Sequence, residues 1–128
     1  FAAQVTPHAT LLVDEAYNEL TDRPEDNAMV DLVRSGKDVI VCRTFSKIYG
    51  MAGLRVGYAI TSEANAKRIQ SHLMSFGGNL AGLAAAIASY DDTPFLTQSR
   101  AAGSDAAGLW SLRNSSKDLR MNMLASLK

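Results

Sequence analysis

The sequence predicts an α/β fold built around a parallel sheet with helices on its faces. Two short apolar runs, Leu11–Val13 and Val39–Cys42, have the length and β-branched content of buried strands. A segment with helical periodicity separates them, and the order strand, helix, strand is typical of a right-handed crossover between parallel strands. A third strand is expected over Val56–Ile60, after a polar segment that contains several glycines.

The elements around the first two strands follow from residue type. Residues 1–7 look like the end of an earlier element, closed by Pro7. A polar loop over residues 22–25 contains Pro24. A helix is then expected from residue 26 or 27 to Ser35, with Gly36 as its stop. Its apolar face would comprise Met29, Leu32 and Val33.

Helices are expected to fill the second half of the chain. Ser62 can cap a helix that reaches Phe76, with an apolar stripe of Ala66, Ile69 and Leu73. Two glycines then break the pattern before a second helix over residues 79–90. That helix has its own apolar stripe of Leu80, Leu83, Ala84 and Ile87.

The last part of the chain gives weaker signals. Thr93 and Pro94 restart a helix, because proline is favoured at the first helical position. Gly103 and Gly108 weaken the pattern beyond it. A stripe at helical spacing is still present there, made of Leu112, Leu119, Met123 and Leu127.

Composition limits the classes of partner and the cellular compartment that we expect for this chain. The chain has 128 residues, enough for one domain with a core, and its 13 basic and 13 acidic side chains cancel. A neutral chain argues against nucleic acid or an anionic membrane as the main partner, and no apolar run is long enough to cross a bilayer. The single Cys42 lies in a strand, so we expect a structural thiol and a cytoplasmic location. His8 and His72 have no second ligand at metal spacing, so no metal site is predicted.

Polar side chains gather where the first two strands end. Asp14 comes directly after the first strand, and Lys47 lies just past the second; ligands of open α/β sheets bind at this edge. Thr44 and Ser46 add hydroxyl groups, and Arg55 adds a planar fork that suits phosphate. Together they indicate an anionic ligand held by its phosphate beside an amine. Taken singly, Asp14 could be a turn or helix cap, and Lys47 a solvated surface lysine.

Three motifs in order resemble the core of fold-type-I, pyridoxal-phosphate (PLP)-dependent aminotransferases of class I/II. They are Val13-Asp-Glu-Ala-Tyr17, Arg43-Thr-Phe-Ser-Lys47 and Gly53-Leu-Arg-Val-Gly57. The run from Ser46 to Tyr58 is most similar to the histidinol-phosphate aminotransferase-like branch. The resemblance is dense over residues 11–60, fair to about residue 90 and poor after about residue 101. It implies part of the mostly parallel PLP-binding large domain over residues 1–90. Residues 91–128 would be a helical segment, either the start of the small domain or an aberrant tail.

The resemblance implies a role for six residues. Lys47 resembles the lysine that forms a Schiff base with the cofactor and then moves the substrate proton. Asp14 matches the carboxylate that pairs with the pyridine nitrogen, and Tyr17 matches the tyrosine bonded to the phenolic oxygen of the ring. The phosphate ligands implied are Thr44, Ser46 and Arg55. A Schiff-base lysine must be neutral to attack, which desolvation and nearby positive charge favour.

The resemblance also implies an activity and its partners. The complete enzyme would move an amino group between an amino acid, or histidinol phosphate, and a 2-oxo acid, and it would be a homodimer. A second phosphate loop, a ring-stacking aromatic and a substrate-binding arginine would lie outside this chain, so we expect the chain alone to be marginally stable and inactive. Arg100, Arg113 and Arg120 do not sit in the substrate-binding motif.

Three other interpretations stay open at this point. The same fold also serves decarboxylases and carbon–carbon ligases that use PLP. A module that only binds phosphate or a nucleotide could use the glycines and Arg55, with Lys47 as a counter-charge. The chain could also be a non-functional remnant.

Overall fold

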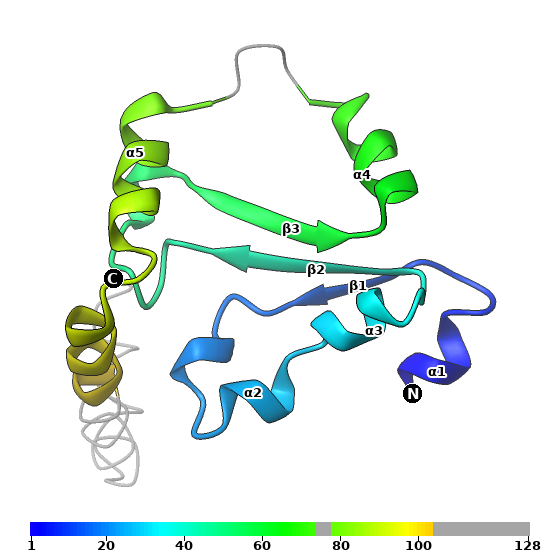
Figure 1. Ribbon diagram of the computed structural model, residues 1–128, viewed down its shortest axis with the longest axis horizontal. Coiled ribbons are helices and arrows are strands. Elements are labelled where there is room, and N and C mark those ends of the chain that lie inside the picture. The colour runs from blue at the N-terminus through cyan, green and yellow to red at the C-terminus, as the bar shows by residue number, and fades with distance from the viewer. Residues whose placement is uncertain (74–77, 104–128) are drawn as a thin grey trace, which may run out of the picture.

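The computed structural model describes residues 1–73 and 78–103, and their centre is a sheet of three strands (Figure 1). The middle strand, β2 (Val39–Thr44), pairs in parallel with β1 (Leu11–Asp14), which confirms the predicted crossover. The third strand, β3 (Gly57–Thr61), pairs with β2 in antiparallel fashion, so this part of the sheet is mixed. A parallel return needs a long crossover, usually a helix. The segment before β3 holds only the 3₁₀ turn η2 (Ala52–Leu54).

The helical region between β1 and β2 differs from the prediction. It contains the 3₁₀ turn η1 (Asn18–Leu20) and two short helices, α2 (Pro24–Asn27) and α3 (Val30–Arg34), in place of one helix over residues 26–35. The break falls at Ala28, whose ψ of 128° is extended. The N–H of Met29 is donated to the Glu15 carboxylate, 2.6 Å away, so a tertiary contact replaces a helical bond.

Both ends of this region also depart from expectation. Pro24 is the first residue of α2 rather than part of a loop, and proline is well suited to that position because its missing N–H would have no helical partner. At the start of the chain, Ala2–Val5 form one helical turn, α1, where only a loose end was expected.

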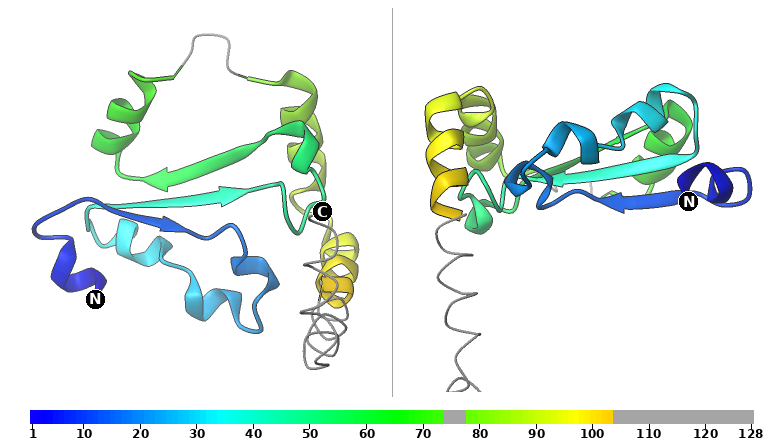
Figure 2. Two further views of the ribbon diagram at one scale, coloured as in Figure 1. Left: turned by 180° about the vertical axis from the view of Figure 1, so that it is seen from behind. Right: turned by 90° about the horizontal axis from the view of Figure 1, so that it is seen from below.

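The sheet has one covered face and one open face. Side chains alternate along a strand, so Val39, Val41 and Arg43 point to one side and Ile40, Cys42 and Thr44 to the other. The first side is the covered face: Val39 and Val41 are 0% exposed, and α3 packs on β2 and β3 (Figure 2). The second side is the open face, where Leu12 of β1 is 63% exposed.

Helix α4 (Glu63–Gln70) begins after the predicted cap Ser62, and helix α5 (Leu80–Ser89) begins after Asn79, the first residue of the predicted helix. The Ser62 hydroxyl accepts the N–H of Asn65 at 3.3 Å, and the Asn79 side chain accepts the N–H of Gly82 at 3.1 Å. The α-helical part of α4 ends at Gln70, before the predicted end at Phe76. Residues 74–77 lie outside the described part of the chain.

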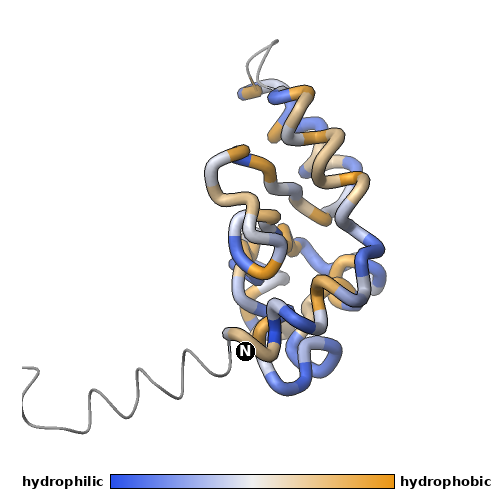
Figure 3. Tube along the Cα trace, turned by 90° about the vertical axis from the view of Figure 1, so that its left-hand side faces the viewer, coloured by the Kyte–Doolittle hydropathy of each residue, from blue (hydrophilic) through white to orange (hydrophobic). Residues whose placement is uncertain are grey.

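The predicted inner face of α5 is wrong. Its large apolar residues are exposed, and Figure 3 shows how apolar the helix is along this side of the molecule; the exposed set is Leu80, Leu83, Ala84 and Ile87. The buried residues are Gly82 and Ala86. A Cβ on Gly82 would lie 2.7 Å from the Cγ2 of Val56, so only the smallest side chain allows this approach. Close packing, rather than hydrophobicity, selects the inner face.

A further helix over residues 93–103 confirms the predicted restart. The Asp92 carboxylate accepts the N–H of Phe95 at 3.1 Å and so caps this helix. Arg100 extends from it and donates to the carbonyl of Glu19 at 2.9 Å. Residues 104–128, with the expected stripe of Leu112, Leu119, Met123 and Leu127, lie outside the described residues. Within residues 1–73 and 78–103, every helix falls short of the length and apolar character that a membrane span needs.

Candidate active site

A pocket of about 300 Å³ lies where β1 and β2 end. It brings together five of the six predicted site residues, Asp14, Thr44, Ser46, Lys47 and Arg55. Ala16, Cys42 and Arg43 complete its lining. Burial and the charge of Asp14 raise the pKa of the Cys42 thiol, which fits the structural thiol predicted for this strand.

Asp14 stands on the open face, at the end of β1 and opposite Cys42 in the strand register. One of its carboxylate oxygens, Oδ1, accepts the N–H of Ala16 at 3.0 Å, so the turn-cap interpretation applies to this oxygen. The side chain is exposed, whereas the sequence predicted a desolvated carboxylate at the end of a buried strand. The prediction failed because β1 is covered on one face only.

Alternating burial presents Lys47 to the pocket. Phe45 and Ile48 are buried, while Lys47 between them is exposed. The Phe45 ring packs 4.6 Å from the ring of Tyr49, centroid to centroid. Its backbone N–H is donated to the carbonyl of Val56 at 3.0 Å, and its carbonyl accepts the N–H of Met51 at the same distance. These anchors fix the loop that carries the lysine.

Thr44, Ser46 and Arg55 form a compact group of donors, which we call the phosphate cradle. The Thr44 hydroxyl accepts the N–H of Ser46 at 3.0 Å. Arg55 Nη1 donates to the Ser46 hydroxyl at 3.4 Å and to the carbonyl of Ala52 at 2.8 Å. Arg55 also has a left-handed backbone, with φ 55° and ψ 52°, which is uncommon for a residue with a side chain. Such strain is concentrated at functional sites in proteins.

The three glycines of the loop have different roles. Gly50 has a φ of 68°, a value that favours glycine. A Cβ on Gly57 would lie 2.9 Å from the carbonyl oxygen of Arg43, so β3 could not approach β2 as closely. Gly53 lies in the 3₁₀ turn η2 and has neither constraint.

Tyr17 lies beside the pocket rather than in its lining. The Lys47 ammonium stands over the Tyr17 ring, with Nζ 4.6 Å from the centroid. Tyr17 also lines a neighbouring pocket of about 390 Å³, which shares Asp14 with the first. The structure therefore brings Tyr17 next to both Asp14 and Lys47.

Sequence reasoning missed an ion pair between Glu15 and Arg43, the latter of which lines the pocket. Arg43 Nη2 lies 2.8 Å and Nε 2.9 Å from Glu15 Oε2, and the two side chains are 18% and 4% exposed. Burial on its own lowers the pKa of Arg43, but the bonds to the Glu15 carboxylate and the nearby Tyr58 phenol outweigh it and raise the pKa above its usual value. The signal in the sequence was a charged residue next to Asp14 and another next to Thr44, each at an inward-facing position of the strand alternation.

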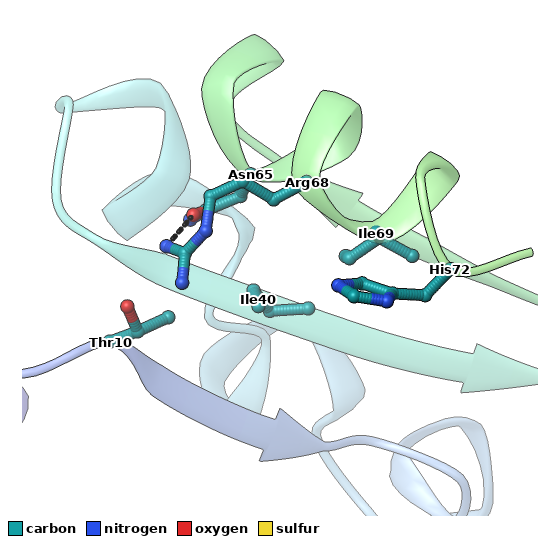
Figure 4. A pocket seen from close by; sticks show the side chains of 6 residues that line it. All are labelled: Thr10, Ile40, Asn65, Arg68, Ile69 and His72. Atoms are coloured by element: carbon teal, nitrogen blue, oxygen red, sulfur yellow. Dashed lines mark hydrogen bonds between the residues drawn. The ribbon is translucent and has the colours of Figure 1, made fainter.

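A second pocket, of about 210 Å³, lies at the other end of β2, beside α4 (Figure 4). It is lined by Thr10, Ile40, Asn65, Arg68, Ile69 and His72. Arg68 donates to the Asn65 side chain at 3.4 Å, and His72 stands beside Ile69. None of the predicted site residues lines this pocket.

The fold and the pocket agree with the outcome of sequence comparison. Residues 2–115 match the family described as aminotransferase class I and II, so the chain belongs to this family.

Among its relatives are histidinol-phosphate aminotransferases. The chain is 44% identical over 96 residues to histidinol-phosphate aminotransferase 2 of Methylococcus capsulatus, covering 75% of this chain and 26% of the relative. It is 42% identical over 100 residues to histidinol-phosphate aminotransferase 2 of Pseudomonas aeruginosa, covering 78% and 27%. The chain therefore spans about a quarter of the length of these relatives.

Solved structures show the same similarity. A putative histidinol-phosphate aminotransferase from Erwinia carotovora atroseptica superposes with a TM-score of 0.70 at 33% identity, over 77% of this chain and 29% of that one. A histidinol-phosphate aminotransferase from Sinorhizobium meliloti, in complex with pyridoxal-5'-phosphate, gives a TM-score of 0.66 at 32% identity, over 77% and 28%.

Proposed function

We propose that this chain carries the cofactor-binding half-site of a PLP-dependent aminotransferase. The observation that supports this most is the single pocket lined by Asp14, Lys47 and Arg55, at the sheet edge where ligands of open α/β sheets bind. The donor set fits the cofactor chemically, with a carboxylate for the ring nitrogen, an amine for the aldehyde and a cradle for the phosphate.

Each residue has a distinct role in this proposal. Thr44, Ser46 and Arg55 would hold the phosphate, because hydroxyl groups and a guanidinium make strong bonds to its oxygens. The Asp14 carboxylate would accept a hydrogen bond from the protonated ring nitrogen and so keep that nitrogen charged. Tyr17 would donate its hydroxyl to the phenolic oxygen of the ring.

Lys47 would act on the reacting atoms. When bound, PLP supplies an electron sink for the carbanion left by the substrate α-proton. The amine of Lys47 would hold the aldehyde end of the cofactor and would move the substrate α-proton as a general acid and base.

The proposed reaction moves an amino group between an amino acid, or histidinol phosphate, and a 2-oxo acid. The names of the relatives support this substrate class. We place residues 1–90 in the large domain, and residues 91–128 would be either the start of the small domain or an aberrant tail. The complete protein would be a cytoplasmic homodimer.

Borohydride reduction tests the proposal in the full chain. After incubation with PLP, reduction should leave a pyridoxyl group on Lys47, detected by mass spectrometry. Reversible phosphate binding without such a group would indicate a binding module instead. Product analysis of the full-length enzyme separates an aminotransferase from a decarboxylase, because only the latter releases carbon dioxide.

A further inference from the structure

We propose that Glu15 and Arg43 are positioning residues, which hold Asp14 at a fixed distance from the phosphate cradle. This inference rests on the function proposed above, since it concerns how two parts of the cofactor pocket are held together. Glu15 follows Asp14 directly, and Arg43 precedes Thr44 directly. Each member of the pair is therefore one residue away from a proposed cofactor ligand.

The bonds of Glu15 join three parts of the structure. Its backbone N–H is donated to the carbonyl of Cys42 at 2.9 Å, which extends the pairing of β1 and β2. Its Oε2 accepts both the Nε and the Nη2 of Arg43, and its Oε1 accepts the N–H of Met29 at the break between α2 and α3. Both carboxylate oxygens are used, and the side chain is 4% exposed.

The same network reaches β3 through Arg43. Arg43 is opposite Tyr58 in the antiparallel register, and the Tyr58 phenol lies close enough to help raise the pKa of Arg43. Charged hydrogen bonds are directional, whereas apolar contacts would allow the strand ends to shift. A buried ion pair often adds little stability over apolar residues of similar size, so its use here lies in geometry.

The consequence is a difference between two ligands. PLP would touch both Asp14 and the phosphate cradle, so its binding depends on the distance between them. Inorganic phosphate would touch the cradle alone, so its binding does not. Loss of the ion pair should therefore weaken the binding of PLP and leave the binding of inorganic phosphate unchanged.

The test uses Glu15→Gln and Glu15→Leu in the full 128-residue chain, so that Arg43, which lines the pocket, is kept in both variants. Binding of PLP is followed by its fluorescence, and binding of inorganic phosphate by NMR titration of the Ser46 and Lys47 amides. Hydrogen exchange of the Met29 amide reports directly whether its bond to Glu15 is lost, and it needs no cofactor. The control is Glu63→Leu with Lys67→Met, an exposed ion pair of α4 with N and O atoms 2.7 Å apart.

We expect the PLP dissociation constant to rise about tenfold or more in both variants, because misplacement by about 1 Å is costly in a preorganised site. The dissociation constant of inorganic phosphate should not change in these variants, and neither constant should change in the control. Hydrogen exchange of the Met29 amide should accelerate. Equal weakening of both ligands, no weakening of either, or unfolding of both variants would overturn the inference. Absence of a pyridoxyl group on Lys47 in the unaltered chain would instead refute the proposed function.

Discussion

The covered and open faces of the sheet use the same residue types for different purposes. Asp14 and Glu15 are adjacent carboxylates, yet Asp14 is exposed beside the pocket and Glu15 is buried in an ion pair. Thr44 and Arg43 of β2 both line the pocket, but the Thr44 hydroxyl accepts the N–H of Ser46 in the cradle, whereas Arg43 is paired with the buried Glu15. The strand alternation sends successive residues to opposite faces. The side of the sheet, rather than the residue type, separates proposed ligands from structural partners.

The largest expected effect is on the open face, at the reacting amine. In the full-length enzyme, Lys47→Ala should lower the transamination rate by about 10⁴-fold, as expected for loss of a general acid–base group. Asp14→Ala should lower it nearly as much, because the ring nitrogen would lose its partner. Steady-state kinetics measures both, and Lys67→Ala on α4 is the matched control. Ordinary turnover by Lys47→Ala would refute the assignment.

The two adjacent carboxylates should differ in stability. Glu15→Ala should lower the free energy of unfolding by about 3 kcal/mol, because it leaves the charge of Arg43 buried without its partner. Asp14→Ala should cost about 1 kcal/mol, since only the turn bond to Ala16 is lost. Urea unfolding followed by circular dichroism measures both. Equal losses would show that the two faces do not differ as described.

Substitution of apolar residues on the two faces should give a smaller difference in the free energy of unfolding. Val41→Ala should lower it by about 2 kcal/mol, because buried apolar surface is lost and a cavity is left. Leu12→Ala should change stability by less than about 0.5 kcal/mol, because Leu12 is mostly exposed. The same urea titration measures both changes. A loss at Leu12 as large as that at Val41 would mean that the open face is covered in solution.

The smallest expected effect is a dependence on alkaline pH. Burial, and then the neighbouring phenols and Glu19, raise the pKa of Tyr49 to about 12. An unfolded tyrosine titrates near 10, so this contribution to stability is complete below about pH 10 and is lost as the pH rises through about 12. Thermal melts between pH 9 and pH 12 should show the decline, and Tyr49→Phe should reduce it.

Local signals predicted much of the fold. The apolar runs located all three strands to within two residues, Ser62 caps its helix as expected, and the start predicted for the next helix is off by one residue. The pocket residues were also predicted together, because Asp14 and Lys47 follow strands whose ends meet at one edge of a parallel pair.

Tertiary contacts account for what the sequence did not predict. The helix between β1 and β2 is split where Met29 bonds Glu15, a residue distant in the chain. The inner face of α5 is set by the close approach of Gly82 to Val56, which the hydrophobic pattern does not reveal. The exposure of Asp14 depends on which face of the sheet is covered, and the strand pattern alone does not show that.

The most direct test of the central claim compares three exposed lysines in the unaltered chain. Lys47 should be labelled by PLP and borohydride at concentrations that leave Lys37 and Lys67 unmodified, and inorganic phosphate should compete with this labelling alone. Peptide mapping by mass spectrometry gives the occupancy of each site. Equal labelling of the three lysines, unaffected by phosphate, would contradict the account, because Asp14, Lys47 and Arg55 would then not bind one cofactor molecule together.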